Sequence, residues 1–193
     1  MQIKSLEFIS QIGLGEDIPD TDHIHVAFIG RSNVGKSSLI NTLAQKKGLA
    51  RSSSAAGYTK TINFYLVNKA FYLVDLPGYG FAQGSVQDRK NLQRLIEWYI
   101  TYPDLTDRQI IVLIIDSKLG FTELDHQMLT LLQDLNKNVI IVANKIDKLK
   151  KNELAKKIKA IEEFAHPYKV IAISNEDKTG IPELIHTLFN KTV

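Results

Sequence analysis

Short apolar runs alternate along the chain with longer stretches in which apolar residues recur at helical spacing. The runs predict six strands, at 25–29, 62–67, 71–74, 110–115, 139–142 and 170–173. Nearly continuous apolar runs are typical of parallel strands covered by helices on both faces. The second and third runs are too close for a helical crossover, so we expect them to form an antiparallel hairpin.

Apolar residues three and four positions apart predict five helices. They are marked by Leu39 and Leu43; by Leu92, Leu95, Ile96 and Tyr99; by Leu124, Met128, Leu131 and Leu132; by Leu154, Ile158, Ile161 and Phe164; and by Ile181, Leu184, Ile185 and Leu188. Ser85, with Asp88 three residues later, is suited to cap the second helix. This alternation predicts an α/β domain with a mostly parallel sheet.

The sequence GRSNVGKSS, residues 30–38, follows the first predicted strand and opens the first predicted helix. It fits the pattern GxxxxGK[ST], in which backbone amides and the positive end of a helix cradle phosphates. Lys36 is expected to bridge β- and γ-phosphates, and the Ser37 hydroxyl to bind Mg²⁺. The motif therefore predicts a nucleoside triphosphate site.

Two further segments are expected to act near the γ-phosphate. The third predicted strand ends in DLPG, where Asp75 is placed to hold Mg²⁺ through water and the Gly78 amide to meet the γ-phosphate. The stretch LARSSSAAGYTK, 49–60, has no apolar period and predicts a mobile loop. Its Thr59 could complete the Mg²⁺ shell while a γ-phosphate is bound, as a nucleotide sensor, and Thr61 is the alternative.

The sequence NKID, 144–147, follows the fifth predicted strand and predicts which base of the nucleotide is recognised. The Asp147 carboxylate can accept hydrogen bonds from N1–H and the exocyclic amine of guanine, whereas adenine presents an acceptor at N1 and lacks that amine. The stem of Lys145 can cover the base, and Asn144 can tie this loop to the phosphate cradle. After the sixth strand, residues 174–176 place a backbone amide near the guanine carbonyl. The order of motifs predicts GTP rather than ATP.

Composition narrows the class of protein. With 193 residues, 44% of them hydrophobic and 23% charged, the chain fits one globular domain. The absence of cysteine excludes disulfides, iron–sulfur clusters and thiolate zinc sites, and the five histidines lack metal-ligand spacing. We find no signal-peptide pattern or membrane-length apolar run, and expect a cytoplasmic protein. A net charge of +3 is too small to establish a nucleic-acid partner.

The segments GRSNVGKSSLIN, TINFYLV, VDLPGYGFA and LxxxIEWYI resemble the Ras-like GTPases of the translation-factor-related class, and more closely the EngB family, also called YihA or YsxC. The resemblance covers about Leu6 to Phe189. It implies a three-layer P-loop GTPase (Ras-like) α/β fold with a mostly parallel six-stranded sheet and one antiparallel strand. Residues 23–193 are expected to form a single GTP-binding domain, on which an N-terminal extension, 1–22, packs.

The same resemblance implies a biological role. It is that of a nucleotide switch in assembly of the large ribosomal subunit, needed for normal cell division and septation. The implied partner is the subunit precursor, through its rRNA or its ribosomal proteins. We expect a monomer that binds neither membrane nor DNA.

Two positions depart from the family pattern. Ala56 stands where a proline usually precedes Gly57, which suggests a looser sensing loop, and Asn144 stands where threonine is more frequent. Neither change alters guanine recognition. The alignment with the family favours Thr59 over Thr61 as the sensing threonine.

Three sets of site residues follow from these motifs. Those expected to contact GTP or GDP are Gly30, Arg31, Ser32, Asn33, Val34, Gly35, Lys36, Ser37, Ser38, Gly57, Tyr58, Thr59, Lys60, Thr61, Asp75, Leu76, Pro77, Gly78, Asn144, Lys145, Ile146, Asp147, Ser174, Asn175 and Glu176. Within this set, Lys36, Thr59 and Gly78 are expected to assist hydrolysis. Mg²⁺ is expected at Ser37, Thr59 and Asp75.

The rate of hydrolysis is expected to be low. Tyr79 follows DxxG where Ras-like enzymes carry a water-orienting glutamine, and a phenol cannot replace that carboxamide. We expect intrinsic turnover at or below the ~10⁻⁴ to 10⁻³ s⁻¹ of an unassisted Ras-type site, with help from a partner. Asn33 matches the asparagine with which potassium-activated GTPases hold K⁺, although it is equally suited to be a plain turn residue.

Other interpretations stay open. Residues 148–159, KLKKNELAKKIK, carry six lysines and one glutamate and form either a solvated helix face or an RNA-binding patch. A P-loop kinase or ATPase would share the cradle but would lack NKID and normally carry an arginine-rich lid, which the sequence does not show. A cell-division scaffold that depends on guanine nucleotide with little hydrolysis would share every motif.

Overall fold

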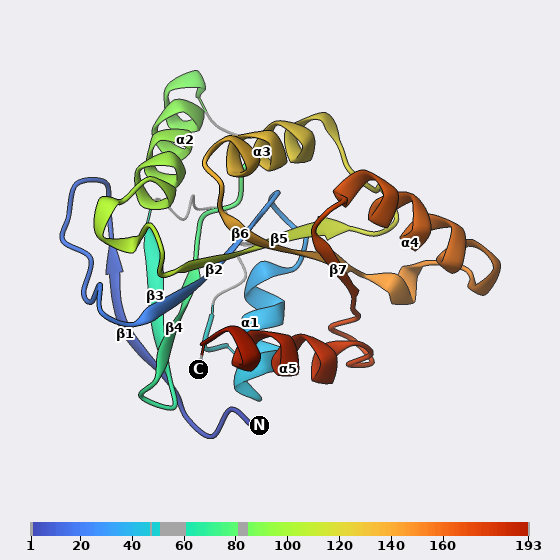
Figure 1. Ribbon diagram of the computed structural model, residues 1–193, viewed down its shortest axis with the longest axis horizontal. Coiled ribbons are helices and arrows are strands. Elements are labelled where there is room, and N and C mark those ends of the chain that lie inside the picture. Colours follow the sequence, from blue (N-terminus) through green and yellow to red (C-terminus); the bar gives the residue numbers. More distant parts are fainter. Residues whose placement is uncertain (1, 47, 51–60, 81–84, 193) are drawn as a thin grey trace.

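The computed structural model describes residues 2–46, 48–50, 61–80 and 85–192 of the chain. It contains a seven-stranded sheet in the order β1-β3-β4-β2-β5-β6-β7, with helices on both faces (Figure 1). The strands are β1 (Leu6–Ile12), β2 (Ile24–Gly30), β3 (Ile62–Val67), β4 (Phe71–Asp75), β5 (Gln109–Asp116), β6 (Asn138–Asn144) and β7 (Lys169–Ala172). The helices are α1 (Lys36–Ala44), α2 (Val86–Ile100), α3 (Glu123–Asp134), α4 (Lys151–Ala165) and α5 (Ile181–Thr192), with 3₁₀ turns η1 (Pro103–Leu105) and η2 (Ile146–Lys148).

The predicted strands and helices are all present, and the α/β class with its three layers is confirmed. Strand β3 runs antiparallel to both of its neighbours, β1 and β4, while β4, β2, β5, β6 and β7 pair in parallel. The prediction of one antiparallel strand is therefore right.

The predicted number of six strands is wrong, because β1 adds a seventh at the sheet edge. In β1 only the first and last residues are buried, and its register with β3 shifts between Phe8 and Ser10. Such a strand shows neither an apolar run nor strict alternation, so its sequence carries no clear strand signal.

The core lies in two layers, one on each side of the sheet. Helices α2, α3 and α4 pack on one face through Leu95, Ile96, Tyr99, Leu129, Leu132, Ile161 and Ala165. Helices α1 and α5 cover the other face through Leu39, Ile40, Leu43, Ile181, Leu184 and Leu188. Each helix thus buries part of its predicted apolar stripe, while the predicted stripe residues Leu124 and Phe164 are exposed. Burial of apolar surface is the main stabilising contribution to such a fold.

Local polar contacts fix the ends of several elements. Ser85 caps α2 as predicted, because its hydroxyl accepts the Asp88 amide at 3.1 Å while its own amide donates to the Asp88 carboxylate at 3.2 Å. In the hairpin between β3 and β4, the Asn68 side chain accepts hydrogen bonds from the amides of Lys4 and Ser5 at 2.7 and 2.9 Å.

No helix in the described residues has both the length and the apolar character that a membrane crossing requires.

Candidate functional site

The predicted motifs meet at one end of the sheet, the end formed by the carboxyl ends of its parallel strands. The phosphate loop (30–38) follows β2, the DLPG turn (75–78) follows β4, and the base loops (144–147 and 174–176) follow β6 and β7. Ligands of open α/β sheets bind outside these strand ends. The fold therefore brings segments far apart in the sequence into a single site.

The phosphate loop is held in shape by amide side chains from both base loops. Asn144 donates to the Val34 carbonyl at 2.7 Å, and Asn175 donates to the Gly35 carbonyl at 3.2 Å. Gly35 has a φ of 104°, and a Cβ there would collide with the Asn144 side chain. Glycine is required on both counts. Asn144 thus makes the link to the cradle that was expected from the sequence.

Lys36 begins α1 and is buried inside the phosphate loop. Its Nζ donates to the carbonyls of Gly30 and Arg31 at 3.0 and 3.2 Å. Burial lowers the pKa of Lys36 to about 8, and the nearby negative charge of Asp75 opposes that shift. The ammonium group therefore contacts the carbonyls of the phosphate loop, within the region predicted to bind phosphate.

Asp75 lies at the end of β4, and its two oxygens differ. Oδ2 accepts the Ser37 hydroxyl at 3.3 Å, whereas Oδ1 is buried with no hydrogen-bond partner among the described residues. Burial raises the pKa of Asp75 to about 6, against the lowering influence of Lys36 and Ser37. A buried carboxylate oxygen without a donor fits a cation ligand. The residues present are therefore suited to Mg²⁺.

The DLPG turn packs directly on the phosphate loop. The Ser32 amide donates to the Tyr79 carbonyl at 2.9 Å, and the Ser32 hydroxyl lies 3.3 Å from the Gly78 carbonyl. A Cβ on Gly78 would lie 2.8 Å from Lys36 Nζ and 2.9 Å from the Ser32 amide nitrogen. The lack of a side chain at Gly78 thus permits this close approach.

The base loops hold Asp147 as an ionised acceptor. Its Oδ1 accepts the Ser174 hydroxyl at 2.9 Å, and its Oδ2 lies 3.1 Å from Lys148 Nζ. Partial burial acts to raise the pKa of Asp147, but the hydrogen bonds from Ser174 and Lys148 outweigh it, and the pKa lies below its ordinary value. The amide of Glu176 donates to the same Ser174 hydroxyl at 3.2 Å.

Lys145 connects the base loop to the phosphate loop. Its Nζ donates to the Asn33 carbonyl at 2.7 Å and to the Asp116 carboxylate at 2.9 Å. The sequence did not single out Asp116, although its place at the end of β5 is the kind of position where site residues occur.

The remaining predicted residues occupy several kinds of position. Gly57, Tyr58, Thr59 and Lys60 lie outside the described residues, so the sensing threonine stays a prediction. Thr61 directly precedes β3 and is partly buried. Leu76 is buried, and its amide donates to the Phe28 carbonyl at 3.2 Å. Ser38, Pro77 and Ile146 lie within the phosphate loop, the DLPG turn and the base loop, respectively.

Asp125, at the start of α3, was not predicted as a site residue. Its carboxylate accepts the Tyr79 hydroxyl at 2.8 Å and lies 3.3 Å from Arg31 Nε. The Arg31 side chain, in the predicted nucleotide-contacting set, is thus paired with a helix outside the four motifs. A spacing pattern could not show this pairing, because the three residues come from three separate segments.

Comparison with known families agrees with this geometry. A sequence model described as 50S ribosome-binding GTPase matches residues 25–145. A second, described as elongation factor Tu GTP binding domain, matches residues 101–192. The crystal structure of a probable GTP-binding protein EngB superposes with a TM-score of 0.71 at 26% identity, covering 87% of this chain and 98% of that one. The fold is that of the P-loop GTPases.

Full-length relatives narrow the family further. The chain is 40% identical over 196 residues to the probable GTP-binding protein EngB of Clostridium perfringens strain SM101, covering 100% of this chain and 98% of that protein. It is also 40% identical over 191 residues to the probable GTP-binding protein EngB of Acholeplasma laidlawii, covering 98% and 99%. The chain therefore belongs to the EngB family of GTP-binding proteins, within the 50S ribosome-binding GTPases.

Proposed function

We propose that the protein binds GTP with Mg²⁺, hydrolyses it slowly to GDP, and uses the two nucleotide states as a switch in assembly of the large ribosomal subunit. The observation that supports this most is the placement of two unlike carboxylates, Asp75 and Asp147, at one end of the sheet. Asp75 has a buried oxygen that lacks a donor, and Asp147 is held ionised by Ser174 and Lys148.

The phosphate region supplies fixed positive charge. Lys36 and the amides of the phosphate loop would stabilise the negative charge that grows on the γ-phosphate as water attacks it. Ser37 and Asp75 would hold Mg²⁺, with Thr59 as the proposed third ligand. Bound Mg²⁺ neutralises phosphate charge and orients the phosphate oxygens.

Hydrolysis is proposed to be slow because a tyrosine, Tyr79, and not a carboxamide directly follows the DLPG turn. The Tyr79 hydroxyl donates to Asp125, so this side chain is engaged away from the role of a water-orienting group. Among the described residues, Lys36 and the loop amides supply charge stabilisation, and Tyr79 does not supply the carboxamide that would position water. We therefore propose that a partner raises the rate.

The base region is proposed to select guanine. Asp147 can accept both N1–H and the exocyclic amine of guanine, while adenine would leave the carboxylate facing a lone pair. Ser174 fixes the carboxylate orientation through its 2.9 Å hydrogen bond. Competition between GTP and ATP for the purified protein tests this part, and equal affinities would contradict it.

Potassium is a proposed second cation of the phosphate region. Asn33, which resembles the potassium-binding asparagine of other GTPases, adopts a φ of 64° in the loop. Such an ion would add positive charge beside the phosphates, as an arginine finger does. Faster hydrolysis in potassium chloride than in sodium chloride is expected, and equal rates would exclude the site.

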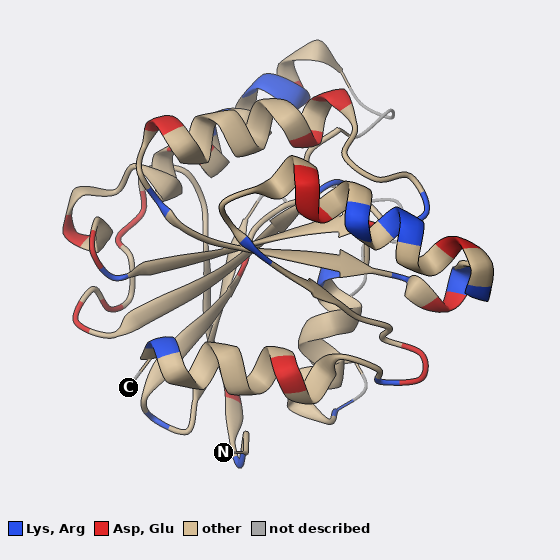
Figure 2. Cartoon of the chain, turned by 45° about the vertical axis from the view of Figure 1, so that its right-hand side comes forward, with Lys and Arg blue, Asp and Glu red and all other residues tan. Residues whose placement is uncertain are grey.

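The large ribosomal subunit precursor is the proposed partner, and α4 offers a basic surface for it. Figure 2 shows blue segments along α4 beside a few red ones. The exposed lysines there include Lys150, Lys151, Lys156 and Lys159. Contacts of this kind to RNA phosphates weaken steeply with salt. Replacement of Lys151 and Lys156 by glutamate should reduce co-sedimentation with large subunits, whereas the same change at Lys69 and Lys191, on other elements, should not.

Single-turnover hydrolysis with and without large ribosomal particles tests the switch as a whole. We expect slow conversion of GTP by the protein alone and acceleration by the particles. Turnover of about one per second by the isolated protein would contradict the assignment of Tyr79. If GTP-dependent binding to the particles occurred with no acceleration, the alternative of a guanine-nucleotide-dependent scaffold in cell division would be favoured.

A further inference from the structure

Asp125 is a fully buried carboxylate that three segments of the chain approach. Its Oδ1 accepts the Tyr79 hydroxyl at 2.8 Å. Its Oδ2 accepts the amide and hydroxyl of Thr122 at 3.0 and 2.7 Å, and Arg31 Nε lies 3.3 Å from the same oxygen. The Asp125 side chain is 0% exposed. A buried charge with this many partners holds those partners in place, because leaving any of them unpaired is costly.

The Tyr79 hydroxyl is a permanent donor in this network. Burial and the negative charge of Asp125 raise the pKa of Tyr79 well above its ordinary value, against the smaller influence of Arg31. The phenol is therefore a hydrogen-bond donor near neutral pH. Its hydrogen bond to a carboxylate belongs to the stronger class of hydrogen bonds.

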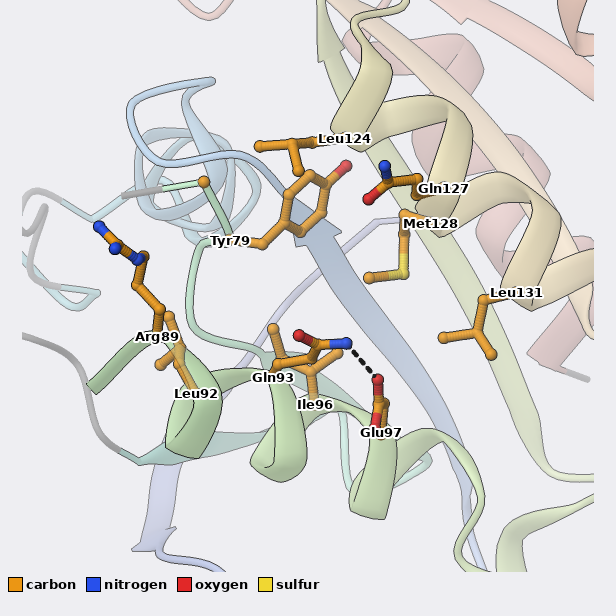
Figure 3. Close-up of a pocket in the computed structure, with 11 residues that line it drawn as sticks. Tyr79, Arg89, Leu92, Gln93, Ile96, Glu97, Leu124, Gln127, Met128 and Leu131 are labelled. Atoms are coloured by element: carbon orange, nitrogen blue, oxygen red, sulfur yellow. Dashed lines mark hydrogen bonds between the residues drawn. The ribbon is translucent and has the colours of Figure 1, made fainter. Parts of the chain in front are cut away.

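The Tyr79 ring packs against the hydrophobic core and also borders open space. The ring lines a cavity of about 480 Å³ between α2 and α3, together with Leu92, Ile96, Leu124 and Met128. Figure 3 shows the ring at one end of this cavity, with side chains of α3 beside its hydroxyl and those of α2 opposite. A ring beside open space can change its orientation once its polar anchor is lost. The hydrogen bond to Asp125 is thus the polar contact that fixes the direction of its hydroxyl.

The backbone of the same turn is attached to the phosphate loop from the other side. The Ser32 amide donates to the Tyr79 carbonyl, and Arg31 and Tyr79 form an isolated parallel bridge. Gly78 directly precedes Tyr79, its carbonyl lies 3.3 Å from the Ser32 hydroxyl, and a Cβ on it would lie 2.8 Å from Lys36 Nζ. Its amide is therefore held between the phosphate loop and the Asp125 network.

We propose that Asp125 is a positioning residue for the γ-phosphate. Through Tyr79 and Arg31 it holds the Gly78 amide where the γ-phosphate is expected, so that the ratio of the affinities for GTP and GDP depends on a carboxylate that touches neither nucleotide. Preorganised donors bind more tightly than donors that must be ordered on binding. GDP lacks the phosphate that Gly78 would meet and should not respond. This inference rests on the proposed function, in which the Gly78 amide meets the γ-phosphate.

The test compares affinities for GDP and for a non-hydrolysable GTP analogue, both with Mg²⁺, in Tyr79→Phe. This variant keeps the ring and leaves Asp125 paired with Thr122 and Arg31. We expect affinity for the GTP analogue to fall by about fivefold to tenfold, the effect of one lost buried hydrogen bond, with GDP affinity within about twofold. An unchanged ratio of the two affinities, or a ratio that moves toward GTP, would overturn the inference.

A second variant separates positioning from general stability. Asp125→Asn should shift the same ratio, and the double variant Tyr79→Phe, Asp125→Asn should shift it by less than the product of the single effects. Asp134→Asn, an exposed position on the same helix, is the matched control and should change nothing. Equal losses for both nucleotides would indicate a merely structural role. Failure of the wild-type protein to bind GDP would instead contradict the proposed function.

Discussion

The phosphate region and the base region each contain a carboxylate that we propose binds a ligand, and the two are held in opposite ways. Asp75 is buried, has one oxygen without a hydrogen-bond donor among the described residues, and has a pKa raised to about 6 by burial. Asp147 is partly exposed, both of its oxygens have partners, and its pKa is lowered. One carboxylate is incomplete without a ligand, and the other is complete before the ligand arrives.

The difference shows how the two ends of the site divide their tasks. A group that is already satisfied can select between bases by shape and hydrogen bonding, with little rearrangement. A buried carboxylate that lacks a donor favours a cation, so its region should respond to metal and to the number of phosphates. We therefore expect selectivity for guanine to be independent of Mg²⁺, and affinity for the phosphates to depend on it.

The largest expected effect comes from the base region. Asp147→Asn should weaken GTP binding by about 10³-fold or more, because the amide presents a donor to the N1–H or exocyclic amine of guanine. Xanthosine triphosphate, which carries a carbonyl in place of that amine, should gain affinity. Competition calorimetry with the two nucleotides measures the exchange of preference. Unchanged GTP affinity, with Asp134→Asn as the control, would remove Asp147 from the base pocket.

Removal of Mg²⁺ should separate the two regions. A chelator should weaken binding of a GTP analogue to the wild-type protein by about tenfold to a hundredfold, or about 1.4 to 2.8 kcal/mol, since the metal neutralises phosphate charge. Asp75→Asn should bind more weakly from the start and respond little to the chelator. Asp147→Asn should keep the full metal effect in its residual binding. If Asp75→Asn responded to the chelator as the wild type does, Asp75 would not hold the metal.

His25 is a buried titratable group that lies outside the predicted set of nucleotide-contacting residues. Burial lowers its pKa from 6.5 to about 4, and its ring nitrogen lies 2.9 Å from the Tyr99 hydroxyl. Because the unfolded chain binds this proton below pH 6.5 and the folded protein does not, His25 should cost about 2 kcal/mol of stability between pH 6.5 and 5. The unfolding free energy of His25→Gln, measured with denaturant, should therefore fall by about 2 kcal/mol less than that of the wild type between pH 6.5 and 5. This difference between wild type and variant should be the same with and without GDP. If the stability of His25→Gln depended on pH as that of the wild type does, the prediction would be contradicted.

The smallest expected effect concerns the link between the two regions. Asn144→Ala removes the hydrogen bond to the Val34 carbonyl and the acceptor of the Lys145 amide, at 2.7 Å each. We expect a loss of about 1 to 2 kcal/mol in unfolding free energy, because buried groups lose their partners. Chemical denaturation measures it. Gln133→Ala, at an exposed position of α3, serves as the control, and equal stability of the two variants would show that the link contributes nothing.

Most of the fold was predictable because its strands are buried on both faces and therefore read as apolar runs. The strand β1 was not predictable, since its middle residues are exposed and its register shifts at Phe8. An edge strand packs on one neighbour only, so its side chains carry little of the period that burial imposes on central strands.

The candidate site was predictable where one short segment carries all the chemistry, as in the phosphate loop and NKID. It was not predictable where side chains from distant segments combine. Asp125 looks like an ordinary residue in the first turn of a helix, and only the fold brings it to Tyr79 and Arg31. Asp116 likewise gains its partner Lys145 only when β5 and β6 lie side by side.

The position of β1 has a consequence for solubility. Strand β1 covers the outer edge of β3, whose sequence INFYLV contains β-branched and aromatic residues and no charge. Without that cover, β3 would present a row of free amides and carbonyls able to recruit a strand from another molecule. The Asn68 side chain accepts hydrogen bonds from the amides of residues 4 and 5 and so helps to hold β1 against β3. We therefore expect β1 to protect this edge from pairing with a strand of another molecule.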